Sequence, residues 1–161
     1  MSARPPSDAI VALRSLGRRF REVFASDDDE AVDELAQRNG TDGHSAFDHV
    51  VAAGHTIAFL GRALDLVLIE DDPVLHPAVL DARERAWPDA TGTVHERLSE
   101  LSWEAEAVAE RAERVPAHDW TRHGRVAGHD RTVSAAEVVW DAVDSAVMHL
   151  KAAGSTLRQV R

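Results

Sequence analysis

Apolar residues recur every three or four positions along four long stretches of the chain, at about 7–25, 45–69, 93–115 and 134–159. This spacing puts them on one face of an α-helix, so each stretch is expected to form an amphipathic helix. The second stretch is apolar around most of its circumference and is expected to be the most buried. The third repeats by four and three without a break, at Val94, Leu98, Leu101, Ala105, Val108, Ala112 and Val115.

Helix caps and turn residues separate these stretches. Ser7 and Asp8 suit the start of the first helix, and Ser134 with Glu137 three positions later predicts a capping box for the last, with Thr132 as the alternative cap. The acidic residues 27–38 have room for two or three helical turns before the break at 39–43. A long crossover over about 70–92 is predicted by its helix breakers, Pro73, Pro77, Pro88 and Gly92.

No stretch alternates apolar and polar residues for long, so no β-sheet is expected. Residues 116–132 are expected to form a polar loop, which Trp120 pins to the helices, and the other tryptophans are also expected to be packing residues. Four helices with one long crossover after the second predict an all-α four-helix bundle, in a single domain covering residues 1–161.

Composition excludes several classes of function. The 161 residues include no cysteine, which excludes disulfide scaffolds, thiolate metal sites and a thiol nucleophile from the chain. A net charge of −10 repels nucleic acids and anionic membranes, so neither is expected as a partner. The first residues lack the apolar core of a signal peptide, and a cytoplasmic location is expected. Arginine supplies nearly all the basic residues, a composition typical of a GC-rich, actinobacterial genome.

Three short motifs carry a resemblance to a known family. They are DGHSAFDHV at 42–50, EDDP at 70–73, and RTVS at 131–134 followed by VMHL at 147–150. Together they are similar to the DinB-like superfamily, which contains YfiT-like metalloenzymes and mycothiol-dependent isomerases and transferases. The resemblance covers roughly residues 8–158 and implies a DinB-like bundle that often forms homodimers. It also implies a divalent metal bound by three histidines, one from the second helix and two, four residues apart, from the last.

This chain departs from that histidine pattern. The resemblance places the three ligand positions at Ala52, Asp144 and Met148, none of which is a histidine. A register shifted by one residue makes His149 the last ligand and Ser145 its partner, and the set is still incomplete. We therefore expect no metal at the family's positions. The alternative is a Zn or Ni site with a changed ligand set, His49, Asp144 and His149.

Other polar residues have two interpretations each. His49 and His149 lie beside apolar helix faces, as ligands or as packed boundary histidines, and His55 is expected to be solvent-exposed. Three carboxylates share one ridge of the last helix and are either solvated or oxygen ligands for Mg or Mn: Glu137, Asp141 and Asp144. Three histidines of the loop fit no metal template and are expected to be solvated: His118, His123 and His129.

Two functional hypotheses follow. In the first, the chain is a DinB-like bundle with a degenerate metal site and a binding or scaffold role, with a small molecule as its ligand. In the second, it is a divalent-metal-dependent transferase that uses a low-molecular-weight thiol such as mycothiol, whose sulfur would replace the missing cysteine. A homodimer through helix faces is expected in both. The sequence assigns no catalytic or cofactor-binding residue and names no substrate.

Overall fold

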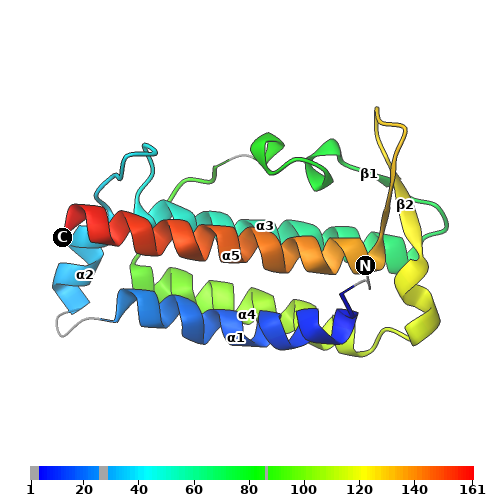
Figure 1. Cartoon of the computed structure of the whole chain (residues 1–161), viewed down its shortest axis with the longest axis horizontal. Coiled ribbons are helices and arrows are strands. Elements are labelled where there is room, and N and C mark those ends of the chain that lie inside the picture. The colour runs from blue at the N-terminus through cyan, green and yellow to red at the C-terminus, as the bar shows by residue number, and fades with distance from the viewer. Residues whose placement is uncertain (1–3, 26–28, 86) are drawn as a thin grey trace.

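The computed structural model describes residues 4–25, 29–85 and 87–161. Its four long helices are α1 (Pro6–Phe24), α3 (Ala46–Ile69), α4 (Val94–Glu113) and α5 (Ala135–Val160). They form the predicted four-helix bundle (Figure 1). A short helix, α2 (Asp29–Ala36), lies within the acidic stretch, and residues 27–28 of that prediction lie outside the described residues.

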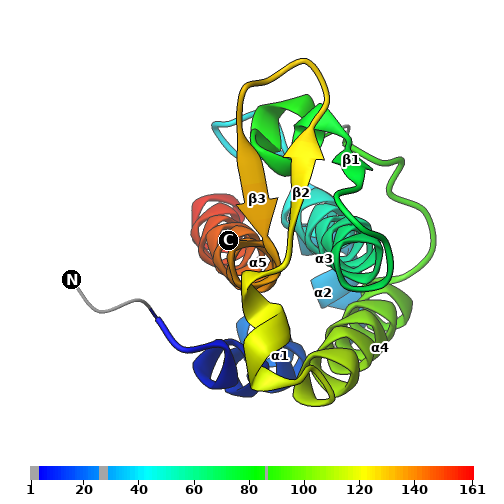
Figure 2. The same cartoon turned by 90° about the vertical axis from the view of Figure 1, so that its right-hand side faces the viewer.

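Each long helix packs against two others. α3 contacts α4 and α5, and α1 contacts the same two helices, so the order around the bundle axis is α1, α4, α3, α5 (Figure 2). α3 and α4 run in the same direction because residues 70–93 return along the outside of the bundle before α4 begins (Figure 1). The predicted crossover is therefore present, and it covers the faces of α3 and α5.

The core consists of the apolar faces that the sequence pattern indicated. α3 contributes the most buried residues, as expected for a helix that is apolar almost all round. By length and composition alone this helix could cross a membrane, but 61% of its most apolar stretch is buried in the bundle. Fully buried large side chains come from all four long helices and include Phe20, Leu13, Ile57, Leu64, Leu101, Val108 and Val138.

Side-chain caps fix where three of the helices begin. Ser134 and Glu137 form the predicted capping box of α5, and similar boxes begin α3 at Ser45 and α4 at Thr93. The prediction for the first helix was wrong in detail. Pro5, and not Ser7, takes the N-cap position and forms no side-chain cap, because Pro6 in the first turn has a suitable φ without one. Asp8 lies in the first turn, as expected.

The expectation of no β-sheet was wrong. A small sheet contains β1 (Val74–Leu75), β2 (His123–Val126) and β3 (Thr132–Ser134), with β1 parallel and β3 antiparallel to β2. The strands are too short for an alternation to stand out, and the inward positions of β2 are Gly124 and Val126. Gly124 allows close approach, since a Cβ there would lie 2.9 Å from the Leu75 side chain. Trp120, in the 3-10 turn before β2, packs against the core as predicted, whereas Trp103, also expected to be a packing residue, is 69% exposed.

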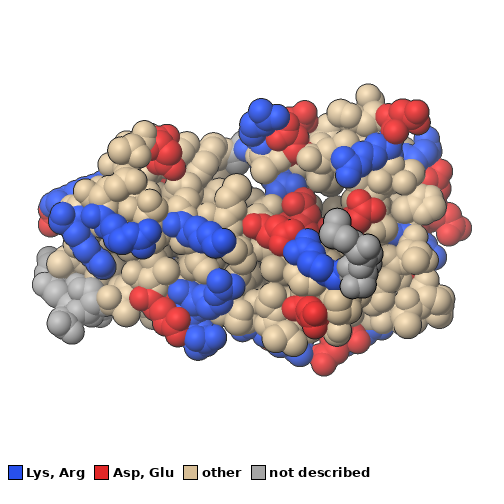
Figure 3. All heavy atoms as spheres, viewed as in Figure 1, with Lys and Arg blue, Asp and Glu red and all other residues tan. Residues whose placement is uncertain are grey.

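The surface is more mixed than the net charge suggests. On the face shown in Figure 3, acidic and basic side chains lie close together, and basic ones gather toward the C-terminal half of α5. The net charge of −10 is therefore not spread as one continuous acidic surface.

Candidate functional site

The first turn of α3 holds a buried histidine against α5. The Ser45 cap aligns the turn, and His49 one turn later is only 4% exposed. Its Nδ1 atom lies 3.0 Å from Nδ1 of His149, which α5 brings to the same level of the bundle. Its Nε2 atom lies 2.9 Å from Oδ2 of Asp42, in the turn before the helix. Asp42, His49 and His149 therefore form a continuous polar chain that leads into the bundle.

The electrostatics of the two ends of this chain determine which group donates to which. Partial burial would raise the pKa of Asp42, but the hydrogen bond from the His44 N–H and the contact with His49 lower it below its ordinary value. Burial, together with the nearby His49 and Arg85, lowers the pKa of His149 to about 4. At neutral pH Asp42 is thus a carboxylate and His149 is uncharged.

Because a carboxylate only accepts hydrogen bonds, His49 donates its Nε2–H to Asp42. Since Nε2 of His49 carries the proton that is given to Asp42, Nδ1 of His49 accepts a hydrogen bond from Nδ1–H of His149. This order leaves Nε2 of His149 unprotonated, and that atom has no hydrogen-bond partner within the described part of the chain. A carboxylate near the surface therefore sets the tautomer of a buried histidine two groups away.

Trp87, from the crossover, covers this chain. Its ring stacks on the ring of His44, with centroids 3.6 Å apart and planes 10° from parallel. It also meets the edges of the His49 and His149 rings, at centroid distances of 5.2 and 5.5 Å. The indole, which is 43% exposed, therefore covers the histidine pair on its solvent side and is not the packing residue that was expected.

An arginine from the crossover points into the same region. Arg85 has a side chain that is only 10% exposed and donates through Nη2 to Asp141, at 2.7 Å. Its Nη1 donates to Oγ of Ser145, at 3.0 Å, and its Nε donates to the carbonyl of Ala78, at 2.9 Å. Ser145 in turn donates to Asp141. These bonds fix the guanidinium in place and neutralise its charge.

A cavity of about 220 Å³ lies between these groups. Its walls include His149, Ser145, Arg85, Trp87 and Thr56. Apolar surface comes from Ala52, Ala82 and Met148, and the exposed Arg83, which pairs with Asp81, completes the lining. A roofed cavity with apolar walls and a few directed polar groups is typical of a small-molecule site.

The structure separates the sequence candidates. Ala52 and Met148 line the cavity, as do Ser145 and His149 of the shifted register. Asp144 does not line it, because its carboxylate is exposed on another side of α5 and forms a bidentate ion pair with Arg4. The set His49, Asp144 and His149 is therefore not assembled, although its two histidines are in contact.

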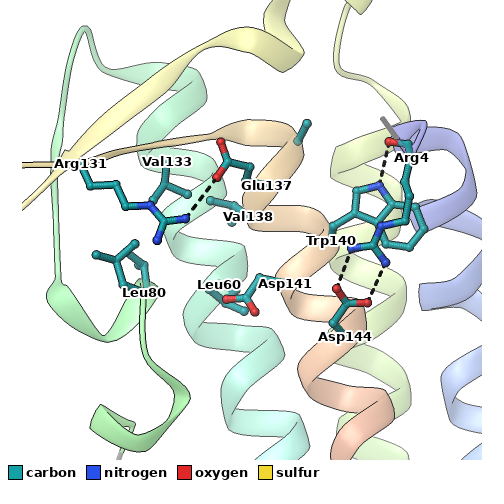
Figure 4. A pocket seen from close by; sticks show the side chains of 12 residues that line it. Arg4, Leu60, Leu80, Arg131, Val133, Glu137, Val138, Trp140, Asp141 and Asp144 are labelled. Carbon is teal, nitrogen blue, oxygen red and sulfur yellow. Dashed lines mark hydrogen bonds and ion pairs between the residues drawn. The ribbon is translucent and has the colours of Figure 1, made fainter. Parts of the chain in front are cut away.

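The three carboxylates of the α5 ridge lie at a second, larger cavity of about 420 Å³ (Figure 4). Each is paired with an arginine from a different segment. The pairs are Arg4 with Asp144, Arg85 with Asp141, and Arg131 with Glu137. The guanidinium of Arg4 also lies 3.9 Å from the centre of the Trp140 ring. Because arginines neutralise the ridge, it does not present the free oxygen ligands that Mg or Mn requires.

The other candidate histidines are not brought together. His55 is exposed on α3 as expected, and the histidines of 116–132 are spread over a 3-10 turn, a strand and the hairpin turn. Within residues 4–25, 29–85 and 87–161, no three His, Cys, Asp or Glu side chains are placed to hold a metal ion. The sequence did not indicate Arg85 or Trp87 as site residues, because both come from the crossover, whose path no periodicity predicts.

Comparisons with known proteins support the same fold. No protein-family model and no curated protein sequence matches the chain. Among solved structures, YfiT from Bacillus subtilis, described as a probable metal-dependent hydrolase with an unusual four-helix bundle topology, superposes with a TM-score of 0.78. The match covers 98% of this chain and 89% of YfiT. At 12% sequence identity this likeness shows the fold alone, a four-helix bundle with the topology of YfiT, and says nothing of the chemistry.

Proposed function

We propose that this DinB-like bundle is a binding protein for a small molecule, and that its cavity uses a fixed arginine where related proteins use a metal ion. One observation carries the proposal. Ser145 stands where the shifted register expects the ligand that partners His149. Its hydroxyl is already occupied, because it accepts a hydrogen bond from Arg85. The third position, Ala52, offers only a methyl group.

The donor set does not suit a metal at this position. A catalytic metal site needs about three protein ligands and an open position. Here His149 is the one nitrogen ligand among the three positions, and the guanidinium of Arg85, whose side chain is 10% exposed, occupies Ser145 beside it. The other polar groups near His149 already bind one another, because Arg85 and Ser145 both donate to Asp141, so a metal ion would have to break these bonds to gain further ligands. A small neutral molecule has no such requirement.

The metal-dependent thiol transferase remains the competing hypothesis because of one feature. The two Nδ1 atoms of His49 and His149 face each other, and Asp42 contacts the outer nitrogen of His49. Carboxylates often orient metal-binding histidines in this way. Zn or Ni held there would have two protein nitrogens, and no third ligand is placed within the described part of the chain.

The two hypotheses differ in metal content and in response to metal. Untagged protein should contain no stoichiometric Zn or Ni by elemental analysis, and added Zn²⁺ or Ni²⁺ should leave its melting temperature unchanged. The His55→Ala variant, with an exposed histidine removed, is the control for weak surface binding. Stoichiometric metal, or a metal-dependent rise in melting temperature that His49→Ala or His149→Ala abolishes but His55→Ala keeps, would favour the transferase instead.

A further inference from the structure

Two mostly buried side chains at the cavity of about 220 Å³ each have one polar atom without a protein partner. His149 is 8% exposed and Thr56 is 6% exposed, and both line the cavity. Neither Nε2 of His149 nor the Thr56 hydroxyl has a hydrogen-bond partner within the described residues. Of these residues only Arg111 has a fully enclosed side-chain nitrogen or oxygen without a hydrogen-bond partner, so the two atoms are open to the cavity, where a ligand or water can bind them.

The polarity of these groups is fixed by their surroundings. The hydrogen-bond order from Asp42 through His49 leaves His149 as an acceptor toward the cavity. Arg85 can only donate, and one N–H of the Nη1 that binds Ser145 is left over. The cavity therefore offers one hydrogen-bond acceptor, Nε2 of His149, and one donor, the remaining N–H of Arg85, to the same ligand.

The charge and size of the cavity narrow the choice further. Asp141 already pairs with Arg85, Asp81 pairs with the exposed Arg83, and His149 is neutral, so a charged ligand would enter the cavity without a free counter-charge. The volume equals that of about seven water molecules at about 30 Å³ each, which leaves room for a small molecule of about seven to ten non-hydrogen atoms. The Trp87 ring and the Met148 side chain offer an apolar wall to the rest of it.

We propose, resting on the small-molecule function above, that the cavity binds a neutral primary carboxamide. The amide N–H donates to Nε2 of His149, and the amide oxygen accepts from Arg85. A carboxylate has no proton to give to His149, and an amidinium has no acceptor for Arg85. The Thr56 hydroxyl can donate or accept and completes the polar contacts.

Three probes of nearly the same shape separate these cases: benzamide, benzoate and benzamidine. Titration calorimetry on the full, metal-free chain at pH 7 should give binding of benzamide, with the two ions weaker by about tenfold or more, because each leaves a buried polar group unsatisfied. Tighter binding of benzoate would overturn the amide proposal and leave small-molecule binding intact. Binding of none of the three would also overturn it. The proposed function itself fails on a different result, stoichiometric metal in the untagged protein.

A variant far from the ligand tests how the preference arises. Asp42→Asn gives His49 an amide that can donate as well as accept, so the tautomer of His149 is no longer fixed. The ratio of benzamide affinity to benzoate or benzamidine affinity should therefore fall, although residue 42 does not line the cavity. Asp130→Asn, an exposed change in the hairpin turn, should keep the full preference. If the folded Asp42→Asn and Asp130→Asn variants both kept the preference for benzamide, the proposed order of protons from Asp42 to His149 would be wrong. The three probes on the unchanged protein test the ligand class independently of either variant.

Discussion

Lowering the pH from 7 to 5 should destabilise the fold through His149. This histidine is 8% exposed, and the groups that face it are His49 and His44 at the start of α3 and Arg85 from the crossover. Burial and these neighbours lower its pKa from 6.5 to about 4 in the folded protein. The unfolded chain therefore binds a proton at this position over a pH range in which the folded chain does not.

The sign and size of the effect follow from that difference. Between pH 6.5 and pH 4 the unfolded state binds more protons, so the free energy of unfolding falls as the pH falls through this range. Each pH unit contributes about 1.4 kcal/mol, so the 1.5 units from 6.5 to 5 correspond to a loss of about 2 kcal/mol. The contribution of His149 is fully present above pH 6.5 and is lost toward pH 4.

Urea unfolding, followed by circular dichroism at pH 7 and pH 5, measures this loss. The His149→Gln variant lacks the titrating ring and should lose about 2 kcal/mol less than the unchanged protein between the two pH values. His55→Gln removes an exposed histidine of α3 and should behave like the unchanged protein. If all three proteins lost the same free energy, His149 would not be the buried neutral group described here.

Three further predictions concern packing, the site and assembly. Gly17→Ala should destabilise the protein by about 1–3 kcal/mol in urea unfolding, because its Cβ would lie 2.8 Å from Cβ of Ser102. A Cβ at Gly54 would have its nearest neighbour at 3.8 Å, so Gly54→Ala should stabilise α3 by about 0.5–1 kcal/mol. If both variants changed the free energy of unfolding in the same direction, the described helix contacts would be wrong. Arg85→Met should cost about 1–3 kcal/mol, because two hydrogen-bonded partners on α5 lose their donor, and an unchanged midpoint would contradict its role. The protein should be a homodimer by light scattering at micromolar concentration and Trp103→Glu a monomer, since this large apolar side chain is 69% exposed beside the groove between α3 and α4. A monomeric parent protein would refute this.

Helix positions were predictable from the sequence because burial of one helix face imposes a period of 3.6 residues. α3 and α5 begin at Ala46 and Ala135, one residue after the predicted starts, and the predicted cap at Ser134 is present. The small sheet was not predictable in this way. β2 has a glycine where an inward side chain would be expected, and its pairing with β1 joins segments about 50 residues apart.

The candidate site was predicted in part. His49 and His149 could be singled out because each is a polar residue beside an apolar helix face, and the structure places them in contact. Periodicity assigns a residue to a helix face but does not say which distant side chain meets it. Arg85 and Trp87 come from the crossover, so their positions depend on how that segment folds back over α3 and α5. Asp144 was a reasonable ligand candidate by spacing, but Arg4 pairs with it outside the cavity.

Nitrogen NMR of the histidine rings at pH 7 tests the central claim most directly, because ring-nitrogen shifts separate protonated, unprotonated and metal-bound nitrogens. We predict that His49 carries its proton on Nε2 and His149 on Nδ1, and that neither a chelator nor added Zn²⁺ changes the ring-nitrogen signals of either histidine. The His49→Gln and His149→Gln variants assign the two signals. A proton on Nε2 of His149, a doubly protonated His49, or metal-bound Nδ1 signals that a chelator removes would contradict it.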